Sequence, residues 1–146
     1  MTTSQGASAQ GFSIDQLDAS KAGETPLEFE YTLDSGKGTG VFIQVLGAQC
    51  ATVTETINRL VDQRRKQQLM EESAARAGEV VFTTNADSID FQRRLAAVRI
   101  HGWRGITDVY SPDAALRLCR VNADIMGQVI SNSNRADHFL KLSSPA

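Results

Sequence analysis

Alternation of apolar and polar residues over residues 27–33 is the feature that most restricts the fold. The apolar members of this alternation are Leu27, Phe29, Tyr31 and Leu33. A period of two among β-forming residues predicts a strand with one buried face. The next segment, DSGKGTG at 34–40, holds three glycines in seven positions, which is typical of a turn. A second apolar run then ends at Gly47, so residues 27–46 are predicted to form a β-hairpin.

Helical periodicity dominates the rest of the chain. Apolar residues recur at spacings of three and four within residues 52–77, 86–100 and 112–131. In the first of these helices the apolar stripe stops at the polar run QRRKQQ, so its second half is expected to project from the body or to bridge to a partner. A lone hairpin is marginally stable in water. We therefore predict an α+β fold, mainly helical, with the N-terminal β-hairpin packed on three to four α-helices.

The two ends differ in composition from the region between them. Residues 1–24 are rich in Ser, Thr, Gly, Ala and Gln and are predicted to form a disordered tail, with a helical turn near Ser13–Leu17 as the alternative. Residues 25–142 are predicted to form a single domain, followed by a short tail at 143–146. No apolar run approaches the length of a membrane span, and the N-terminus lacks the pattern of a signal peptide. We expect no membrane association.

The charge balance argues against nucleic-acid binding. The 146 residues carry 15 Lys and Arg against 17 Asp and Glu, a net charge of -2. The most basic run, Arg64–Lys66, has no interleaved aromatic residue for base stacking, so a solvated helix face is the preferred interpretation. Cys50 and Cys119 are far apart in sequence and are expected to be reduced, half-buried residues.

A search for catalytic or ligand-binding motifs favours a non-enzymatic protein. The run SGKGTG lacks the P-loop spacing and is followed by a strand, so a hairpin turn is preferred. Neither histidine lies at metal-ligand spacing from another ligand. Asp87 and Asp90 lie one turn apart at a helix N-terminus, where acidic residues offset the helix dipole. Cys50 precedes a helix, but no base is near it in sequence. We expect no catalytic residue, no cofactor and no metal.

The stretch HGWRGITDVYSP holds the only Trp of the chain and suggests a corner between two helices. Glycines let the backbone turn, Trp103 buries a large area, and Ser111 with Pro112 begins the next helix. A corner within the core is the preferred interpretation, and an exposed partner-binding Trp is the alternative. Six residues are hypothetical partner contacts. They are Trp103, Arg104 and Tyr110 at the corner, and Arg64, Arg65 and Met70 on the projecting helix.

Several short motifs in a fixed order resemble a family of bacteriophage tail assembly chaperone-like, or tail-region, proteins. The motifs are Gly36, Gly40 and Val45-Leu46-Gly47; Gly102, Trp103 and Gly105; Tyr110-Ser111-Pro112; Ala114, Ala115, Leu116 and Leu118; Gln128-Val129; and Asn134, Arg135, Phe139 and Leu140. The likeness covers about residues 27–142. It departs from the family at Pro112-Asp113, where many relatives carry an acidic residue or Asn after the Ser.

The resemblance implies a role in virion assembly. A tail assembly chaperone binds the tape-measure protein and keeps it soluble while tube subunits polymerise around it, so the expected partners are tape-measure or tube protein in the host cytoplasm. One alternative is a structural tail-completion or connector protein retained in the virion. Another is a regulator or anti-host protein that binds a bacterial factor. A homo-oligomer also remains open, because the hairpin needs a partner surface.

Overall fold

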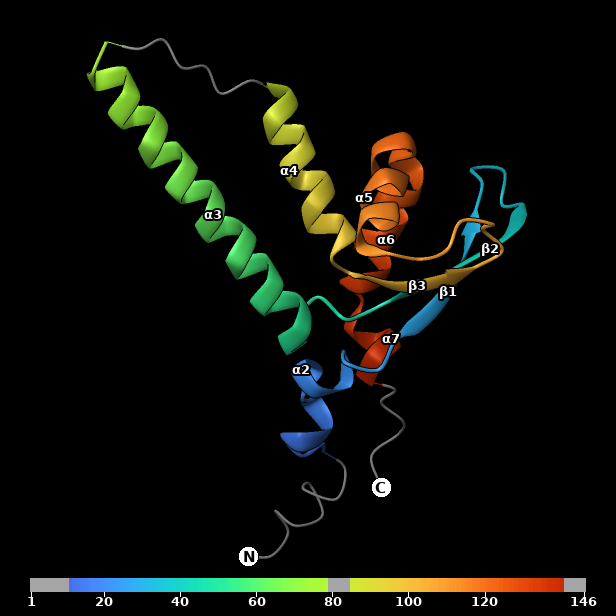
Figure 1. Cartoon of the computed structure of the whole chain (residues 1–146). Coiled ribbons are helices and arrows are strands. Elements are labelled where there is room, and N and C mark those ends of the chain that lie inside the picture. Colours follow the sequence, from blue (N-terminus) through green and yellow to red (C-terminus); the bar gives the residue numbers. More distant parts are fainter. Residues whose placement is uncertain (1–10, 79–84, 141–146) are drawn as a thin grey trace, which may run out of the picture.

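A computed structural model describes residues 11–78 and 85–140 and has a three-stranded sheet beside six α-helices (Figure 1). This arrangement confirms the predicted α+β, mainly helical fold with an N-terminal hairpin. In chain order the elements are the 3-10 turn η1 (Asp15–Leu17), α2 (Ala19–Ala22), β1 (Leu27–Thr32), β2 (Gly38–Val45), α3 (Ala51–Arg76), α4 (Asn85–Ala97), β3 (Ile100–Arg104), α5 (Pro112–Val121), α6 (Ala123–Ser133) and α7 (Ala136–Leu140).

The hairpin forms as the alternation requires. β1 and β2 pair antiparallel, with Leu27 opposite Val45 and Phe29 opposite Ile43. In the turn, Gly36 has a φ of 86°, a left-handed conformation that side chains disfavour. The outer edge of β1 is closed at Thr32 by a side chain from α6. The Gln128 amide donates to the Thr32 carbonyl at 2.7 Å and accepts from the Thr32 N–H at 3.3 Å.

The third strand corrects the prediction of a helix over 86–100. α4 ends at Ala97, and residues 100–104 form β3, which pairs antiparallel with β2 so that the sheet order is β1-β2-β3. Trp103 therefore lies on a strand opposite Ile43, and not at a helix end. The Leu46 N–H also donates to the Arg99 carbonyl at 2.8 Å, which continues the pairing. Ile100 continues the helical spacing of the sequence, but its pairing with Val45 of β2 places it on a strand.

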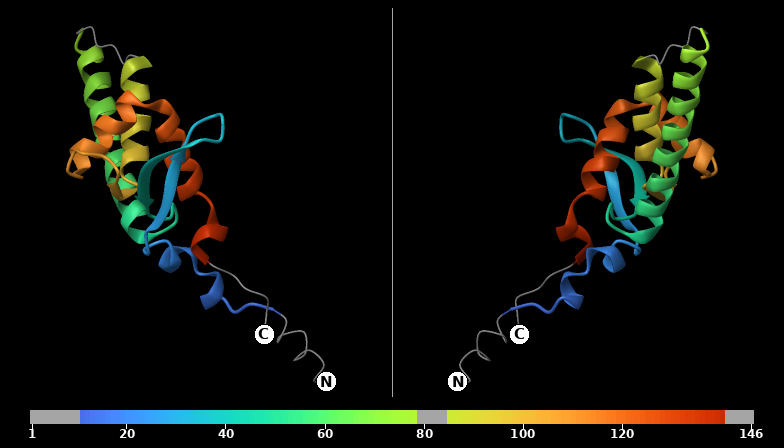
Figure 2. Two further views of the ribbon diagram at one scale, coloured as in Figure 1. Left: turned by 90° about the vertical axis from the view of Figure 1, so that its right-hand side faces the viewer. Right: turned by 90° about the vertical axis from the view of Figure 1, so that its left-hand side faces the viewer.

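The core lies between one face of the sheet and the helices α4, α5 and α6, which the two side views in Figure 2 also show packed beside the sheet. Its buried members come from the sheet and from the helices: Ile43, Val45, Ala96, Ala97, Ile100, Ala115, Cys119, Ile125, Val129 and Phe139. The apolar half of the β1 alternation packs against this cluster. The opposite face of the sheet carries mainly polar and charged side chains from β1, β2 and β3.

The predicted helix over 112–131 is two helices. Ser111 caps α5 as expected, its side chain accepting from the Ala114 N–H at 3.0 Å. Asn122 then adopts an extended conformation, with φ -142° and ψ 97°, and its side chain accepts from the Ile125 N–H to cap α6. The helical stripe crosses this break, but Val121 is 75% exposed, so the stripe does not lie on one continuous face.

The N-terminal prediction needs correction where the structure describes it. Residues 15–22 lie in the predicted disordered tail but form η1 and α2. The turn η1 falls where the alternative placed a helical turn, near Ser13–Leu17, and α2 packs against α7 (Figure 1). The Asp18 side chain caps α2, and the Gly47 N–H donates to the Gly23 carbonyl at 2.9 Å. Residues 1–10 and the predicted C-terminal tail at 143–146 lie outside the described residues.

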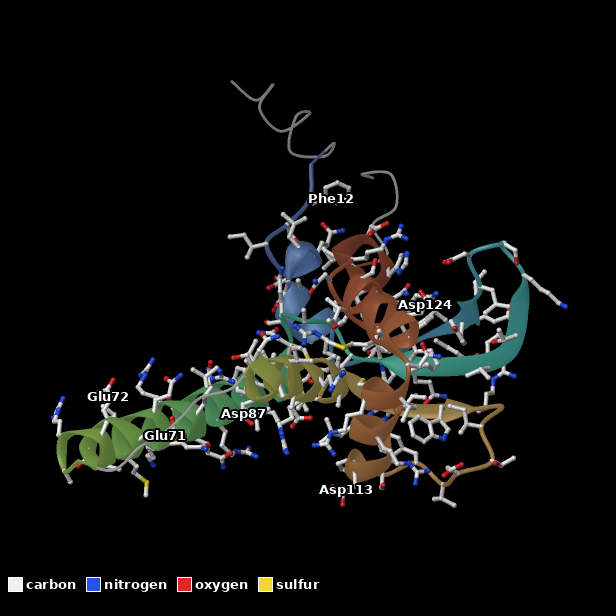
Figure 3. The ribbon with its side chains drawn as sticks, turned by 90° about the horizontal axis from the view of Figure 1, so that it is seen from above. Phe12, Glu71, Glu72, Asp87, Asp113 and Asp124 are labelled. Atoms are coloured by element: carbon white, nitrogen blue, oxygen red, sulfur yellow. The ribbon has the colours of Figure 1, made fainter. Side chains whose placement is uncertain are left out.

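Helix α3 changes character along its length. Near its start, Val53 packs with Leu46 and Cys50 in a second small cluster, and Ile57 lies against it. Toward its end the side chains are exposed, and Figure 3 shows Glu72 on the part of α3 that extends away from the sheet. The second half of α3 thus extends beyond the sheet, as predicted from the sequence, but it lies beside α4 (Figure 1). Within the described ranges, no helix is both long and apolar enough to cross a membrane.

Candidate functional site

Trp103 and Tyr110 form a corner that is built into the core. Their rings meet edge to face, with centroids 5.2 Å apart and planes at 80°. The Trp103 indole N–H donates to the Asp108 carbonyl at 2.9 Å, and the Tyr110 hydroxyl donates to the Ile100 carbonyl at 2.8 Å. Both rings are half-buried against the core cluster. This geometry favours the core-corner interpretation over an exposed partner-binding Trp.

Arg104 lies on the other face of the sheet from Trp103, because successive side chains on a strand point to opposite faces. Its guanidinium makes a two-pronged ion pair with Glu28 of β1, with the shortest N–O distance 2.9 Å, across the intervening strand β2. It also lies 3.8 Å from the ring centroid of Phe42. The Arg104 guanidinium holds the pKa of the Glu28 carboxyl below its usual value.

The hypothetical contact set at the corner is therefore divided. Trp103 and Tyr110 face the core. Arg104 lies on the face of the sheet opposite the core, where its ion pair with Glu28 joins the two edge strands. Sequence reasoning missed Glu28 and Phe42, the partners of Arg104. Neither has a local signal, because only the register of the three strands brings them together.

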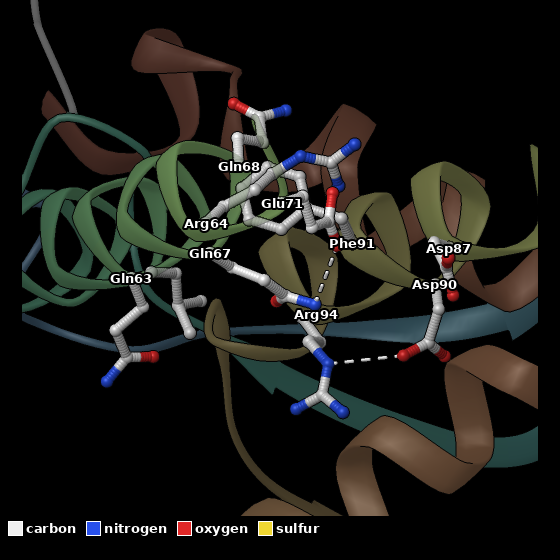
Figure 4. A pocket seen from close by; sticks show the side chains of 10 residues that line it. Gln63, Arg64, Gln67, Gln68, Glu71, Asp87, Asp90, Phe91 and Arg94 are labelled. Carbon is white, nitrogen blue, oxygen red and sulfur yellow. Dashed lines mark hydrogen bonds and ion pairs between the residues drawn. The ribbon is translucent and has the colours of Figure 1, made fainter. Parts of the chain in front are cut away.

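Arg64 on α3 is engaged within the chain. Its guanidinium donates to the Ser88 hydroxyl at 3.1 Å and lies 4.5 Å from the ring centroid of Phe91, both on α4. These contacts bridge a cleft of about 300 Å³ between α3 and α4, which Figure 4 shows from close by. The residues that line it from α3 are Leu60, Gln63, Arg64, Gln67, Gln68 and Glu71. Arg64 thus positions α3 against α4.

Arg65 and Met70 are exposed, and Met70 has 72% of its surface accessible. Beside Met70 lies Leu69, which is 57% exposed and was not among the candidate contacts. Leu69 is nine residues from Leu60, which is about two and a half helical turns. It therefore points away from the cleft that Leu60 lines. Its signal was present in the sequence, as an apolar residue directly after a polar run.

The two cysteines and Asp90, singled out in the sequence, occupy buried or ion-paired positions. Cys50 and Cys119 are free and buried, and burial raises the pKa of the Cys50 thiol and brings that of Cys119 to about 11. Asp90 forms ion pairs with Arg120 of α5 and Arg94 of α4, and the hydrogen bond from Arg120 is the main reason its pKa is lowered. Among residues 11–78 and 85–140 no group of three or more His, Cys, Asp or Glu side chains could hold a metal ion.

Comparison with known proteins assigns no family. No protein-family model, no curated protein and no solved structure matches this chain.

Proposed function

We propose that this chain is a non-enzymatic protein of bacteriophage tail assembly, which binds tape-measure or tube protein as a chaperone in the host cytoplasm. The observation that carries the proposal is the far end of α3, where the consecutive residues Leu69 and Met70 have 57% and 72% of their surfaces exposed. Contiguous exposed apolar surface marks sites of protein interaction, and these two side chains are the largest exposed apolar groups at this end of α3. The class of partner comes from the resemblance of the sequence motifs to those of tail assembly chaperones.

The chemistry of this end of α3 suits an extended or incompletely folded partner. Methionine is flexible and polarisable, so it adapts to apolar surfaces of irregular shape. Arg65 lies one turn before Leu69 and adds an exposed cation that can pair with acidic side chains of the partner. Arg64 does not contribute directly, because Ser88 and Phe91 already engage it.

The test is recovery of tail proteins on the tagged chain from infected cells, with purified virions analysed in parallel by mass spectrometry. We expect tape-measure or tube protein on the tagged chain and no copies of the chain in virions. The double variant Arg65→Glu/Met70→Glu should recover at least about tenfold less tail protein, since burying one Met side chain contributes about 1.5–3 kcal/mol. The matched control is Lys37→Glu/Val109→Glu, which makes the same two types of change at exposed positions elsewhere.

Three results would contradict the proposal in different ways. A fixed copy number in the virion would favour a structural tail-completion or connector protein. Recovery of a bacterial factor without any tail protein would favour an anti-host regulator. Unchanged recovery by Arg65→Glu/Met70→Glu would show that the end of α3 is not the binding surface.

A further inference from the structure

The far half of α3 presents a second, solvent-exposed face on the side of the helix away from α4. We call it the outer face. It includes Arg65 and Ser73, and the five residues on which the argument rests are Asp62, Lys66, Leu69, Glu72 and Arg76. All five are exposed. Their spacing of four, three, three and four residues keeps them within one side of a helix. The cleft-lining residues of α3 occupy the opposite side.

Four charges on the outer face are ordered symmetrically about Leu69, and a fifth, Arg65, lies at the position that mirrors the uncharged Ser73. Moving from Leu69 toward the start of α3, the charges are positive at Lys66 and negative at Asp62. Moving toward its end, they are negative at Glu72 and positive at Arg76. Each pair is equidistant from Leu69 and opposite in sign. Such a surface complements its own copy when that copy is turned through a two-fold axis.

We propose that two copies of this chain pair through their outer faces, with the α3 helices antiparallel and Leu69 of each copy on the two-fold axis. In this arrangement Lys66 of one copy faces Glu72 of the other, and Asp62 faces Arg76. The axis creates each of these pairs twice, so four ion pairs surround a small apolar centre. A two-fold interface of this kind closes on itself and forms a dimer.

The interactions that the pairing would replace are weak. Within one chain Arg76 lies 3.8 Å from Glu72, but their side chains are 81% and 61% exposed, so the pair contributes little. Covering Leu69, by contrast, removes an apolar side chain from water. The outer face from 62 to 76 is about 21 Å long, at 1.5 Å per residue. One helix pair of this length makes a small interface, so the dimer should be weak and reversible.

The surface is the same end of α3 that the proposed function assigns to a tail protein, and the two occupants would compete for Leu69. The inference itself is tested on the purified full-length chain with no tail protein present. Either proposal can therefore fail alone.

The experiment is sedimentation velocity over protein concentrations from about 5 to about 500 µM, a range suited to a small interface. The mass of the wild-type chain should rise with concentration from 15.9 kDa toward twice that value. Lys66→Glu should weaken the dimer about tenfold, because two attractions per dimer become repulsions. Lys37→Glu makes the same charge change in the hairpin turn and should leave the association unchanged.

A charge swap separates specific pairing from a general effect of charge. Lys66→Glu/Glu72→Lys restores opposite charges across the axis, so its dimer should return to within about threefold of wild type. Far-UV circular dichroism checks that each variant keeps its helices. A wild-type chain that stays monomeric throughout, or a charge swap no better than Lys66→Glu alone, would overturn the inference.

Discussion

Replacement of Gly105 by Ala tests the closest backbone approach around the sheet. Gly105 follows β3 directly and has a φ of 83°, and a Cβ built on it would lie 2.2 Å from the Gly40 carbonyl oxygen. That oxygen belongs to the backbone of β2, so it cannot move aside as a flexible side chain would. The left-handed conformation alone costs about 1–2 kcal/mol for a residue with a Cβ. Relieving the overlap should cost about 1–3 kcal/mol more.

Gly36→Ala is the matched control, because Gly36 has a φ of 86° and a Cβ there would meet nothing within 4 Å. Urea unfolding followed by circular dichroism gives the free energy of unfolding of both variants. We expect Gly36→Ala to lose about 1–2 kcal/mol and Gly105→Ala about 2–5 kcal/mol. Equal losses for the two variants, within about 0.5 kcal/mol, would refute the claim that the β2 backbone closes on Gly105.

Two further predictions concern the core and an ion-pair network. Ser133 is 2% exposed, and its hydroxyl donates to the Leu46 carbonyl at 2.7 Å. Ser133→Ala should therefore lower the free energy of unfolding by about 1–2 kcal/mol. Ser131 is exposed on the same helix, so the control Ser131→Ala should change the free energy of unfolding little. Because ion pairs lower the pKa of Asp90 in the folded state, their contribution is present at neutral pH and is lost as the pH falls through that lowered pKa. Asp90→Asn should therefore be less stable than wild type at pH 7, and the difference in the free energy of unfolding should shrink in acid. Urea unfolding at each pH measures this difference. A difference that does not change with pH would show that Asp90 does not act through its charge.

Local patterns predicted those parts of the fold that depend on local interactions. The alternation from Leu27 fixed the face of β1 that packs on the core, and Ser111 with Pro112 marked the start of α5. The third strand was missed because its identity depends on pairing with β2, remote in sequence. Gly102 illustrates this dependence: it reads as a helix breaker, yet in the sheet a Cβ there would meet the Gln44 side chain at 2.9 Å.

The candidate contacts were harder to predict than the elements. Arg104 was singled out beside Trp103 because the two are adjacent in sequence, but strand geometry sends them to opposite faces. Arg64 was grouped with Arg65 for the same reason, and helix geometry turns Arg64 toward Phe91. Neighbouring charged residues in a sequence become one surface only when the period of their element allows it. Leu69 was passed over although it is next to Met70 in the sequence.

The amide of Gln128 has a consequence for how copies of this chain can aggregate. A strand arriving at the outer edge of β1 would need the Thr32 N–H and carbonyl, and both are already bonded to that one side chain. Edge strands with unsatisfied backbone groups can pair with strands of other chains, and such pairing leads to aggregation. At high protein concentration, closing this position disfavours edge-to-edge addition of a strand from another copy.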